Sequence, residues 1–173
     1  MTNFKEDLTR VKAFVFDIDG VMSLQTISLN AFGVPNRTVN LRDGYAIQLA
    51  VKKGYRVGII SGSNAKEYIR RLKGLGVSDI YLNSRAKTEH FNNFCTKHEI
   101  QPSDVMFMGD DIPDYGVMKL AGVPVCPSDA DSEIKKVSSY ISDKRGGEGC
   151  VRDVIEQVLR LHNNWMDNDA FTW

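Results

Sequence analysis

Short apolar runs alternate along this chain with segments of helical periodicity, and this alternation limits the folds that the chain can adopt. Four runs have the length and composition of buried strands and lie at residues 11–16, 55–60, 79–82 and 105–108. Apolar residues at helical spacing predict helices at residues 43–53, 64–73, 86–98 and 150–161. Strands that alternate with helices favour a parallel sheet covered by helices on both faces. A chain of 173 residues fits one such domain, so the sequence predicts a single α/β domain over residues 1–173.

Two local patterns refine this prediction. An extended stretch at residues 24–30 and 37–41 is interrupted by Gly33-Val34-Pro35-Asn36, which is typical of a turn. We therefore expect a β-hairpin inserted at about residues 23–41. Asn64 is expected to cap the helix that follows it.

Composition excludes several classes of partner. The 22 basic and 22 acidic residues give a formal net charge of zero, which provides no electrostatic reason to expect nucleic acid or an anionic membrane. The three cysteines, Cys95, Cys126 and Cys150, are far apart and odd in number, which argues against a disulfide framework or a zinc site. Reduced thiols favour a cytoplasmic protein. Residues 1–7 lack the apolar core of a signal peptide, and no stretch approaches the roughly 20 apolar residues that cross a bilayer.

Two acidic clusters each follow a predicted strand. Asp17 and Asp19 follow the first strand, and Asp110, Asp111 and Asp114 follow the fourth. Since the ligand crevice of a parallel sheet lies at the carboxyl ends of its strands, we expect the clusters to converge there. Clustered carboxylates suit Mg²⁺, and a pair of them can divide the roles of nucleophile and proton donor. The alternative is structural, because Asp-Gly is a common turn and Asp114 would suit the positive end of a helix.

Three further features can bind a phosphate. Ser61 and Gly62 follow the second strand, where a hydroxyl and backbone N–H groups can hold a phosphate oxygen, although Ser-Gly is also a simple turn. Lys87 lies near the start of a predicted helix, an unfavourable place for a cation that phosphate binding would explain. The alternative is an ordinary solvated lysine. Three glycines within residues 146–149 form a turning or mobile loop beside Arg145, which can clamp an anion or simply belong to a surface connection.

The order of these motifs resembles that of the haloacid dehalogenase superfamily. The motifs are Asp-x-Asp-Gly-Val, Ser-Gly, a later Lys and Gly-Asp-Asp-x-x-Asp, and the resemblance spans residues 11–114. A closer resemblance covers nearly the whole chain. Arg42-Asp43-Gly44-Tyr45 after the expected hairpin, the lack of a large cap insertion, and the glycine-rich segment at 145–149 resemble the family of 3-deoxy-D-manno-octulosonate 8-phosphate (KDO 8-phosphate) phosphatases.

The resemblance implies a Rossmann-like three-layer sandwich of the capless haloacid dehalogenase type. It also implies a Mg²⁺-dependent homotetramer that hydrolyses a small phosphorylated sugar acid in lipopolysaccharide precursor synthesis. The hairpin at about residues 23–41 would build the subunit interface. The C-terminal loop and tail would span about residues 144–173, and the glycine-rich loop within them would reach the active site of a neighbouring subunit.

The resemblance also implies roles for individual residues. Asp17 would be the nucleophile, and Asp19 would be the general acid and base and a metal ligand through its backbone carbonyl. Asp17 and Asp110 would bind the metal with their carboxylates, and other residues would support the site. The remaining candidates are Asp111 and Asp114 for support of the metal, Ser61, Gly62 and Lys87 for the phosphoryl oxygens, and Arg42, Arg71, Arg145, Gly146 and Gly147 for the substrate.

Three positions depart from the pattern of this family. Leu24 stands where an acidic residue is frequent, Ser63 where an arginine is frequent, and Leu82-Asn83 where a Gln-Gly pair is frequent. These differences concern sugar recognition rather than phosphoryl transfer. Another phosphorylated nonulosonic or keto-deoxy sugar acid, such as a 9-phosphate, is therefore an alternative substrate. A phospho-accepting receiver domain and a catalytically idle assembly domain are the non-enzymatic alternatives.

Overall fold

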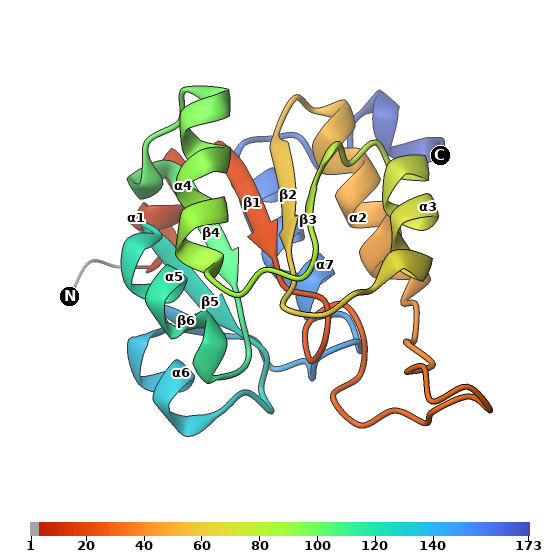
Figure 1. The fold of residues 1–173 in the computed structure, drawn as a ribbon. Coiled ribbons are helices and arrows are strands. Elements are labelled where there is room, and N and C mark those ends of the chain that lie inside the picture. Colours follow the sequence, from red (N-terminus) through yellow and green to blue (C-terminus); the bar gives the residue numbers. More distant parts are fainter. Residues whose placement is uncertain (1–3) are drawn as a thin grey trace.

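A six-stranded parallel sheet forms the centre of the computed structural model, which describes residues 4–173 (Figure 1). The strand order is β3-β2-β1-β4-β5-β6, and every neighbouring pair is parallel. The strands are β1 (Ala13–Phe16), β2 (Arg56–Ile60), β3 (Asp79–Tyr81), β4 (Val105–Met108), β5 (Val123–Cys126) and β6 (Tyr140–Ile141). The structure does not describe residues 1–3. They form the start of the segment, residues 1–7, in which the sequence predicts no signal peptide.

Helices cover both faces of this sheet. They are α1 (Phe4–Asp7), α2 (Leu41–Lys52), α3 (Lys66–Gly74), α4 (Lys87–His98), α5 (Tyr115–Leu120), α6 (Ser132–Val137) and α7 (Cys150–Leu161). Short 3₁₀ turns are η1 (Leu8–Arg10), η2 (Pro102–Asp104), η3 (Ile112–Asp114) and η4 (Asn168–Phe171). None of the helices in the described part of the chain combines the length and apolar character needed to span a membrane.

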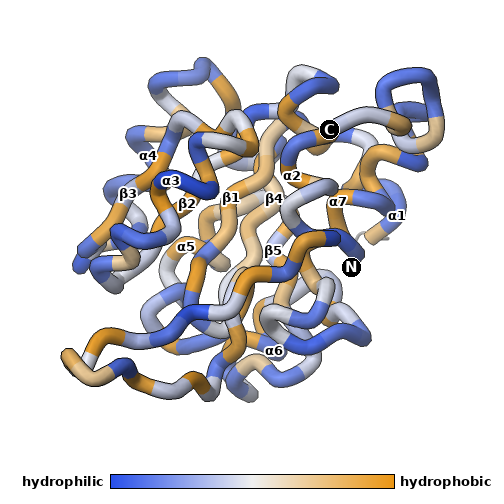
Figure 2. The backbone as a smooth tube through the Cα atoms, turned by 90° about the vertical axis from the view of Figure 1, so that its right-hand side faces the viewer, coloured by the Kyte–Doolittle hydropathy of each residue, from blue (hydrophilic) through white to orange (hydrophobic). Residues whose placement is uncertain are grey.

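The alternation of side chains along β1 explains the three layers. Successive residues of a strand point to opposite faces. Phe14 and Phe16 pack into one core with residues of α2, α3 and α7, whereas Ala13 and Val15 pack into a second core with residues of α4, α5 and α6. Figure 2 shows the central strands as an apolar interior between helices with hydrophilic outer turns. The predicted three-layer α/β sandwich is thus confirmed.

Two local predictions have different outcomes. The cap at Asn64 is wrong, because α3 begins at Lys66 with Ala65 as its N-cap residue and without a side-chain cap. Asn40 provides the corresponding interaction for α2, since its side chain accepts hydrogen bonds from the N–H groups of Arg42 and Asp43. The helix α2 therefore begins two residues before the predicted position.

The β-hairpin is not confirmed as a pair of strands. One antiparallel bridge joins Leu29 to Pro35, and the N–H of Asn36 donates to the carbonyl of Ser28 at 2.8 Å. Proline has no N–H to donate, so the ladder cannot continue regularly through Pro35. The segment projects from the body of the molecule as a long loop in Figure 1. Phe32, near its tip, is 90% exposed.

The C-terminal tail is docked against α2. The ring of Trp173 makes an edge contact with the ring of Tyr45, at 5.7 Å between centroids. Lys53 forms ion pairs with Asp167 and Asp169. The tail thus covers one side of α2 in the same chain.

Candidate active site

Three polar residues meet where adjacent strands end. Asp17 follows β1, Ser61 follows β2 and Asp110 lies just beyond β4. Because β1 lies between β2 and β4, these side chains converge at the carboxyl edge of the sheet, as predicted. They line a pocket of about 260 Å³. The other residues of the pocket are Asp19, Gly20, Gln25, Gly62, Ser63, Lys87, Asp111, Pro113 and Asp114.

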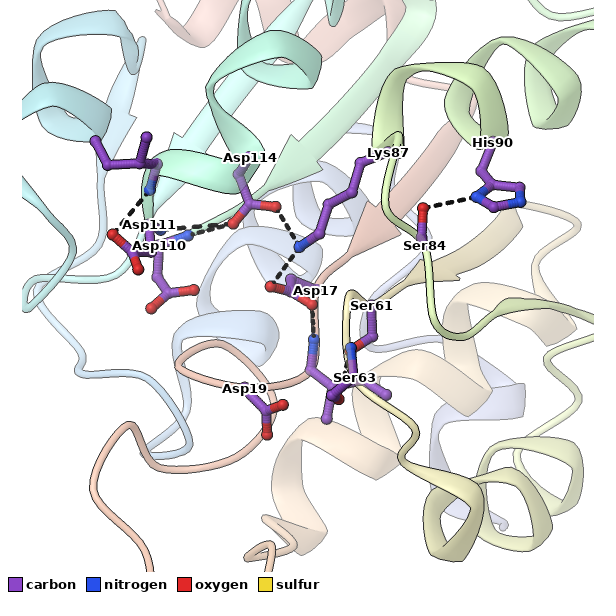
Figure 3. Close-up of polar contacts among 12 residues, drawn as sticks. Asp17, Asp19, Ser61, Ser63, Ser84, Lys87, His90, Asp110, Asp111 and Asp114 are labelled. Carbon is purple, nitrogen blue, oxygen red and sulfur yellow. Dashed lines mark hydrogen bonds and ion pairs between the residues drawn. The ribbon is translucent and has the colours of Figure 1, made fainter. Parts of the chain in front are cut away.

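Lys87 is buried between two carboxylates, as Figure 3 shows. Its Nζ lies 2.7 Å from Asp17 Oδ2 and 2.7 Å from Asp114 Oδ1. Burial lowers the pKa of Lys87, but the charges of Asp17 and Asp114 outweigh burial and raise that pKa above its ordinary value. Lys87 therefore remains a cation inside the pocket, and the reading as a solvated surface lysine is wrong.

The pocket holds more acidic groups than this one cation can balance. Carboxylate oxygens of Asp17, Asp110 and Asp114 all lie within 4.8 Å of one another. Burial, and then the charge of Asp114, raise the pKa of Asp17 to about 7. Burial, and then the charge of Asp17, raise the pKa of Asp110 to about 8. Such a cluster of oxygen donors fits a hard divalent cation such as Mg²⁺, which would compensate the excess negative charge.

The backbone of the first acidic motif is shaped around Asp110. Gly20 has a φ of +78°, and a Cβ at this position would lie 2.0 Å from Asp110 Oδ2. Only glycine combines that backbone conformation with such a close approach. The Asp-Gly turn is therefore part of the acidic site. The structural interpretation of this motif as a turn and its interpretation as part of an acidic site are compatible.

Asp114 is more than a helix cap. Together with Asp111 it forms the capping box of η3. Its Oδ2 also accepts a hydrogen bond from the N–H of Asp110 at 3.0 Å, while its Oδ1 contacts Lys87. Asp114 thus fixes the backbone that carries Asp110 relative to the buried lysine.

The second motif contributes two hydroxyl groups. The Oγ atoms of Ser61 and Ser63 lie 2.9 Å apart, and the N–H of Ser63 donates to Ser61 Oγ at 3.2 Å. A Cβ at Gly62 would lie 4.0 Å from Cε of Lys87. The predicted phosphate-binding residues Ser61, Gly62 and Lys87 are therefore neighbours across the pocket.

Asp19 lies at the mouth of the pocket and contacts a residue that sequence reasoning missed. Arg37 Nε lies 2.6 Å from Asp19 Oδ1, and Arg37 Nη2 lies 3.1 Å from Asp19 Oδ2. Gln25 was also missed, and its Nε2 lies 3.4 Å from Asp110 Oδ2. Neither residue belongs to a recognisable motif, so only the folding of the loop reveals them.

The predicted substrate-side arginines do not line this pocket. Arg42 lines a separate hollow of about 930 Å³ between α2 and α7, which contains neither Asp17 nor Lys87. The guanidinium of Arg71 lies over the ring of Trp173, 5.9 Å from its centroid. Arg145 is exposed and lies 3.4 Å from Asp129. The larger hollow is therefore not the site of the predicted chemistry.

The glycine-rich segment packs against the turn that follows Asp17 in the same chain. A Cβ at Gly146 would lie 1.9 Å from the carbonyl oxygen of Gly20, and the N–H of Gly147 donates to the carbonyl of Val21 at 2.8 Å. Asp129 accepts a hydrogen bond from the N–H of Gly146 at 2.9 Å. These contacts support the turn that follows Asp17.

Comparison with known proteins finds consistent similarities. A family model described as haloacid dehalogenase-like hydrolase matches residues 73–154. The 3-deoxy-D-manno-octulosonate 8-phosphate phosphatase KdsC of Escherichia coli K12 is 32% identical over 149 residues, which cover 86% of this chain and 79% of that protein. KdsC of Salmonella typhi has the same identity and coverage.

Solved structures agree with these sequence matches. The 3-deoxy-D-manno-octulosonate 8-phosphate phosphatase of Yersinia pestis has a TM-score of 0.90 and 28% identity, over 94% of this chain and 88% of that chain. The corresponding phosphatase of Moraxella catarrhalis, in complex with magnesium ion, phosphate ion and KDO, has a TM-score of 0.90 and 31% identity. That match covers 99% of this chain and 97% of the other, so the similarity extends over nearly the whole fold.

Proposed function

This chain belongs to the 3-deoxy-D-manno-octulosonate 8-phosphate phosphatase family, and on that premise we propose that it hydrolyses KDO 8-phosphate to KDO and inorganic phosphate with Mg²⁺ as its cofactor. One observation carries the proposal. Asp17 is buried at the end of β1, with Lys87 on one side and the carboxylates of Asp110 and Asp114 close by. This arrangement combines a nucleophile, a cation for the phosphoryl group and oxygen ligands for a metal.

Asp17 begins the proposed reaction as the nucleophile. One of its oxygens attacks phosphorus, the bond from phosphorus to the 8-oxygen of the sugar breaks, and Asp19 gives that oxygen a proton. Asp19 then accepts a proton from a water molecule that attacks the aspartyl phosphate. Inorganic phosphate leaves and the Asp17 carboxylate is restored. The carboxylate nucleophile avoids the need for free hydroxide at neutral pH.

The other residues of the pocket stabilise the group in transfer. Lys87, the hydroxyl of Ser61 and the backbone at Gly62 would bind the phosphoryl oxygens. Mg²⁺ bound by Asp17, Asp110 and the carbonyl of Asp19 would neutralise charge that develops on the phosphoryl group. Asp111 and Asp114 would orient the backbone around these ligands.

We also propose that the protein acts as a cytoplasmic homotetramer of single-domain subunits, each formed by residues 1–173. Exposed apolar side chains on the projecting segment, including Leu29 and Phe32, support an interface there. Assembly would close a pocket in which the Asp19 side chain is 40% exposed in one subunit. In the tetramer, the substrate-side candidates Arg42, Arg71, Arg145, Gly146 and Gly147 would act on the sugar acid of the same or a neighbouring site. The three buried, unpaired cysteines agree with a reducing compartment.

Phosphate release from a panel of sugar phosphates, with Mg²⁺ and with EDTA, tests the proposed function. We expect Mg²⁺-dependent release from KDO 8-phosphate to exceed release from every other member of the panel. Faster release from a nine-carbon sugar acid 9-phosphate would replace the substrate and keep the mechanism. A lack of release from all members would contradict the phosphatase proposal and favour a receiver or assembly domain.

A further inference from the structure

Arg37 connects the proposed general acid to two other parts of the fold. Its guanidinium contacts both carboxylate oxygens of Asp19, through Nε at 2.6 Å and Nη2 at 3.1 Å. Its remaining terminal nitrogen, Nη1, donates to Oε1 of Glu67 in the first turn of α3. The Arg37 side chain is 5% exposed, although it lies in a segment without regular secondary structure.

The backbone next to Arg37 is fixed as well. The N–H of Thr38 donates to Ser23 Oγ at 2.9 Å, and the N–H of Leu24 donates to Thr38 Oγ1 at 2.9 Å. The hydroxyl of Tyr68 on α3 donates to the carbonyl of Thr38. Arg37 therefore extends from a backbone that is attached both to the loop after Asp19 and to α3.

This geometry restricts the Asp19 side chain, whose hydrogen bonds within residues 4–173 are those to Arg37. Asp19 is 40% exposed and faces the pocket, so without a partner its carboxyl group would sample several rotamers. A guanidinium that contacts both oxygens fixes the plane and the direction of the carboxyl group, which a lysine ammonium cannot do. Each oxygen has a second lone-pair site, which leaves room for the proton in transfer.

We propose that Arg37 is a positioning residue that holds Asp19 for proton transfer to the leaving oxygen of the substrate. This inference depends on the proposed function, in which Asp19 protonates the 8-oxygen of the sugar. Arg37 itself does not touch the reacting atoms. Its contribution is largest when the leaving group is a strongly basic alkoxide that needs a proton.

The test compares two substrates whose leaving groups differ in their need for a proton. KDO 8-phosphate releases a sugar alkoxide, whereas p-nitrophenyl phosphate releases a weakly basic phenolate. The quantity is kcat/KM, because it includes departure of the leaving group but not the later hydrolysis of the aspartyl phosphate. We expect Arg37→Met to lower kcat/KM for KDO 8-phosphate by roughly 10-fold to 100-fold, part of the full effect of general acid catalysis. The loss on p-nitrophenyl phosphate should be several times smaller.

Three further variants separate positioning from folding. Arg37→Lys keeps the charge but loses the two-point contact, so we expect it to restore only part of the activity on KDO 8-phosphate. Glu67→Gln weakens the ion pair between Arg37 and Glu67. It should also lower kcat/KM more for KDO 8-phosphate than for p-nitrophenyl phosphate, with a smaller loss than in Arg37→Met. Arg70→Met makes the same change at an exposed position of α3 and is the control for the loss of an arginine.

Equal losses on both substrates in Arg37→Met would overturn the inference, since they would indicate a general structural role. Unchanged activity on both would overturn it as well. The proposed function fails in a different way, because a wild-type protein that hydrolyses neither substrate would remove the reaction on which the inference depends. A selective loss on KDO 8-phosphate in Arg37→Met and Glu67→Gln, but not in Arg70→Met, would support it.

Discussion

Replacing Asp110 with asparagine should stabilise the metal-free protein at pH 8. Burial, and then the charge of Asp17, raise the pKa of Asp110 from 3.8 to about 8. In the folded protein this carboxyl group therefore keeps its proton to a much higher pH than in the unfolded chain. Between these two pKa values the unfolded chain binds fewer protons, so the free energy of unfolding falls as pH rises. Asparagine has nearly the same shape and does not ionise.

The size of the effect follows from the shift. One pKa unit corresponds to about 1.4 kcal/mol, so a rise from 3.8 to about 8 corresponds to on the order of 5 kcal/mol at pH 8. The asparagine amide brings a buried donor whose lack of a partner costs about 1–3 kcal/mol. We expect a net stabilisation of about 3 kcal/mol at pH 8. At pH 4 the carboxyl group is protonated in the folded protein and already partly protonated in the unfolded chain, so this stabilisation should nearly disappear.

Urea unfolding of both proteins at pH 4, 6 and 8, with EDTA and with Mg²⁺, measures this difference. Mg²⁺ at 100 times its Kd would stabilise the wild-type protein by about 2.7 kcal/mol and the variant much less, because a ligand is missing. Asp143→Asn, at a 75% exposed side chain, is the matched control and should change stability by less than about 0.5 kcal/mol. If Asp110→Asn destabilised the metal-free protein equally at all three pH values, a carboxyl group of raised pKa at position 110 would be excluded.

Three other predictions concern separate parts of the site. Lys87→Met should lower kcat by roughly 10²-fold to 10³-fold and destabilise the metal-free protein by about 3–5 kcal/mol at pH 8, because it leaves buried carboxylates without their cation. Steady-state kinetics and urea unfolding measure the two effects, and near-wild-type turnover would contradict the prediction. Gly20→Ala should weaken Mg²⁺ binding in calorimetry, since the alanine Cβ would displace the Asp110 carboxylate. The backbone φ of +78° at this position also costs about 1–2 kcal/mol for alanine, and unchanged Mg²⁺ affinity would argue against the close contact with Asp110. Phe32→Glu should reduce the molar mass measured by light scattering, because it places a charge in the proposed interface at a residue that is 90% exposed in one subunit. An unchanged molar mass would place the interface elsewhere.

The sequence predicted the parts of the site that depend on strand ends. Asp17, Ser61 and Asp110 each follow an apolar run, and the rule for parallel sheets is sufficient to bring them together. A lysine at a helix start is unfavourable, and this position of Lys87 indicated a role other than that of a solvated side chain. The ion pairs of Lys87 with Asp17 and Asp114 explain why it is there. The unfavourable position of this cation was therefore a sign of the acidic pocket.

Contacts made by loops were not predictable in the same way. Arg37 reaches Asp19 across 18 residues of chain, through a segment whose path depends on Thr38, Ser23 and Tyr68 rather than on a repeating pattern. The expected cap at Asn64 failed because the chain after Ser61 stays non-helical for several residues before α3 begins. Periodic patterns specify elements, whereas single side-chain contacts specify how the loops between them lie.

The role of Asp17 as the nucleophile is tested most directly by locating the phosphoryl group on the protein during turnover. Enzyme that is mixed with KDO 8-phosphate and Mg²⁺ and quenched rapidly in acid can be digested and analysed by mass spectrometry. We expect one phosphoryl group on the peptide that contains Asp17, and none when Mg²⁺ is removed or in Asp17→Asn. Phosphorylation of a different residue, or sustained turnover by Asp17→Asn, would show that Asp17 is not the nucleophile.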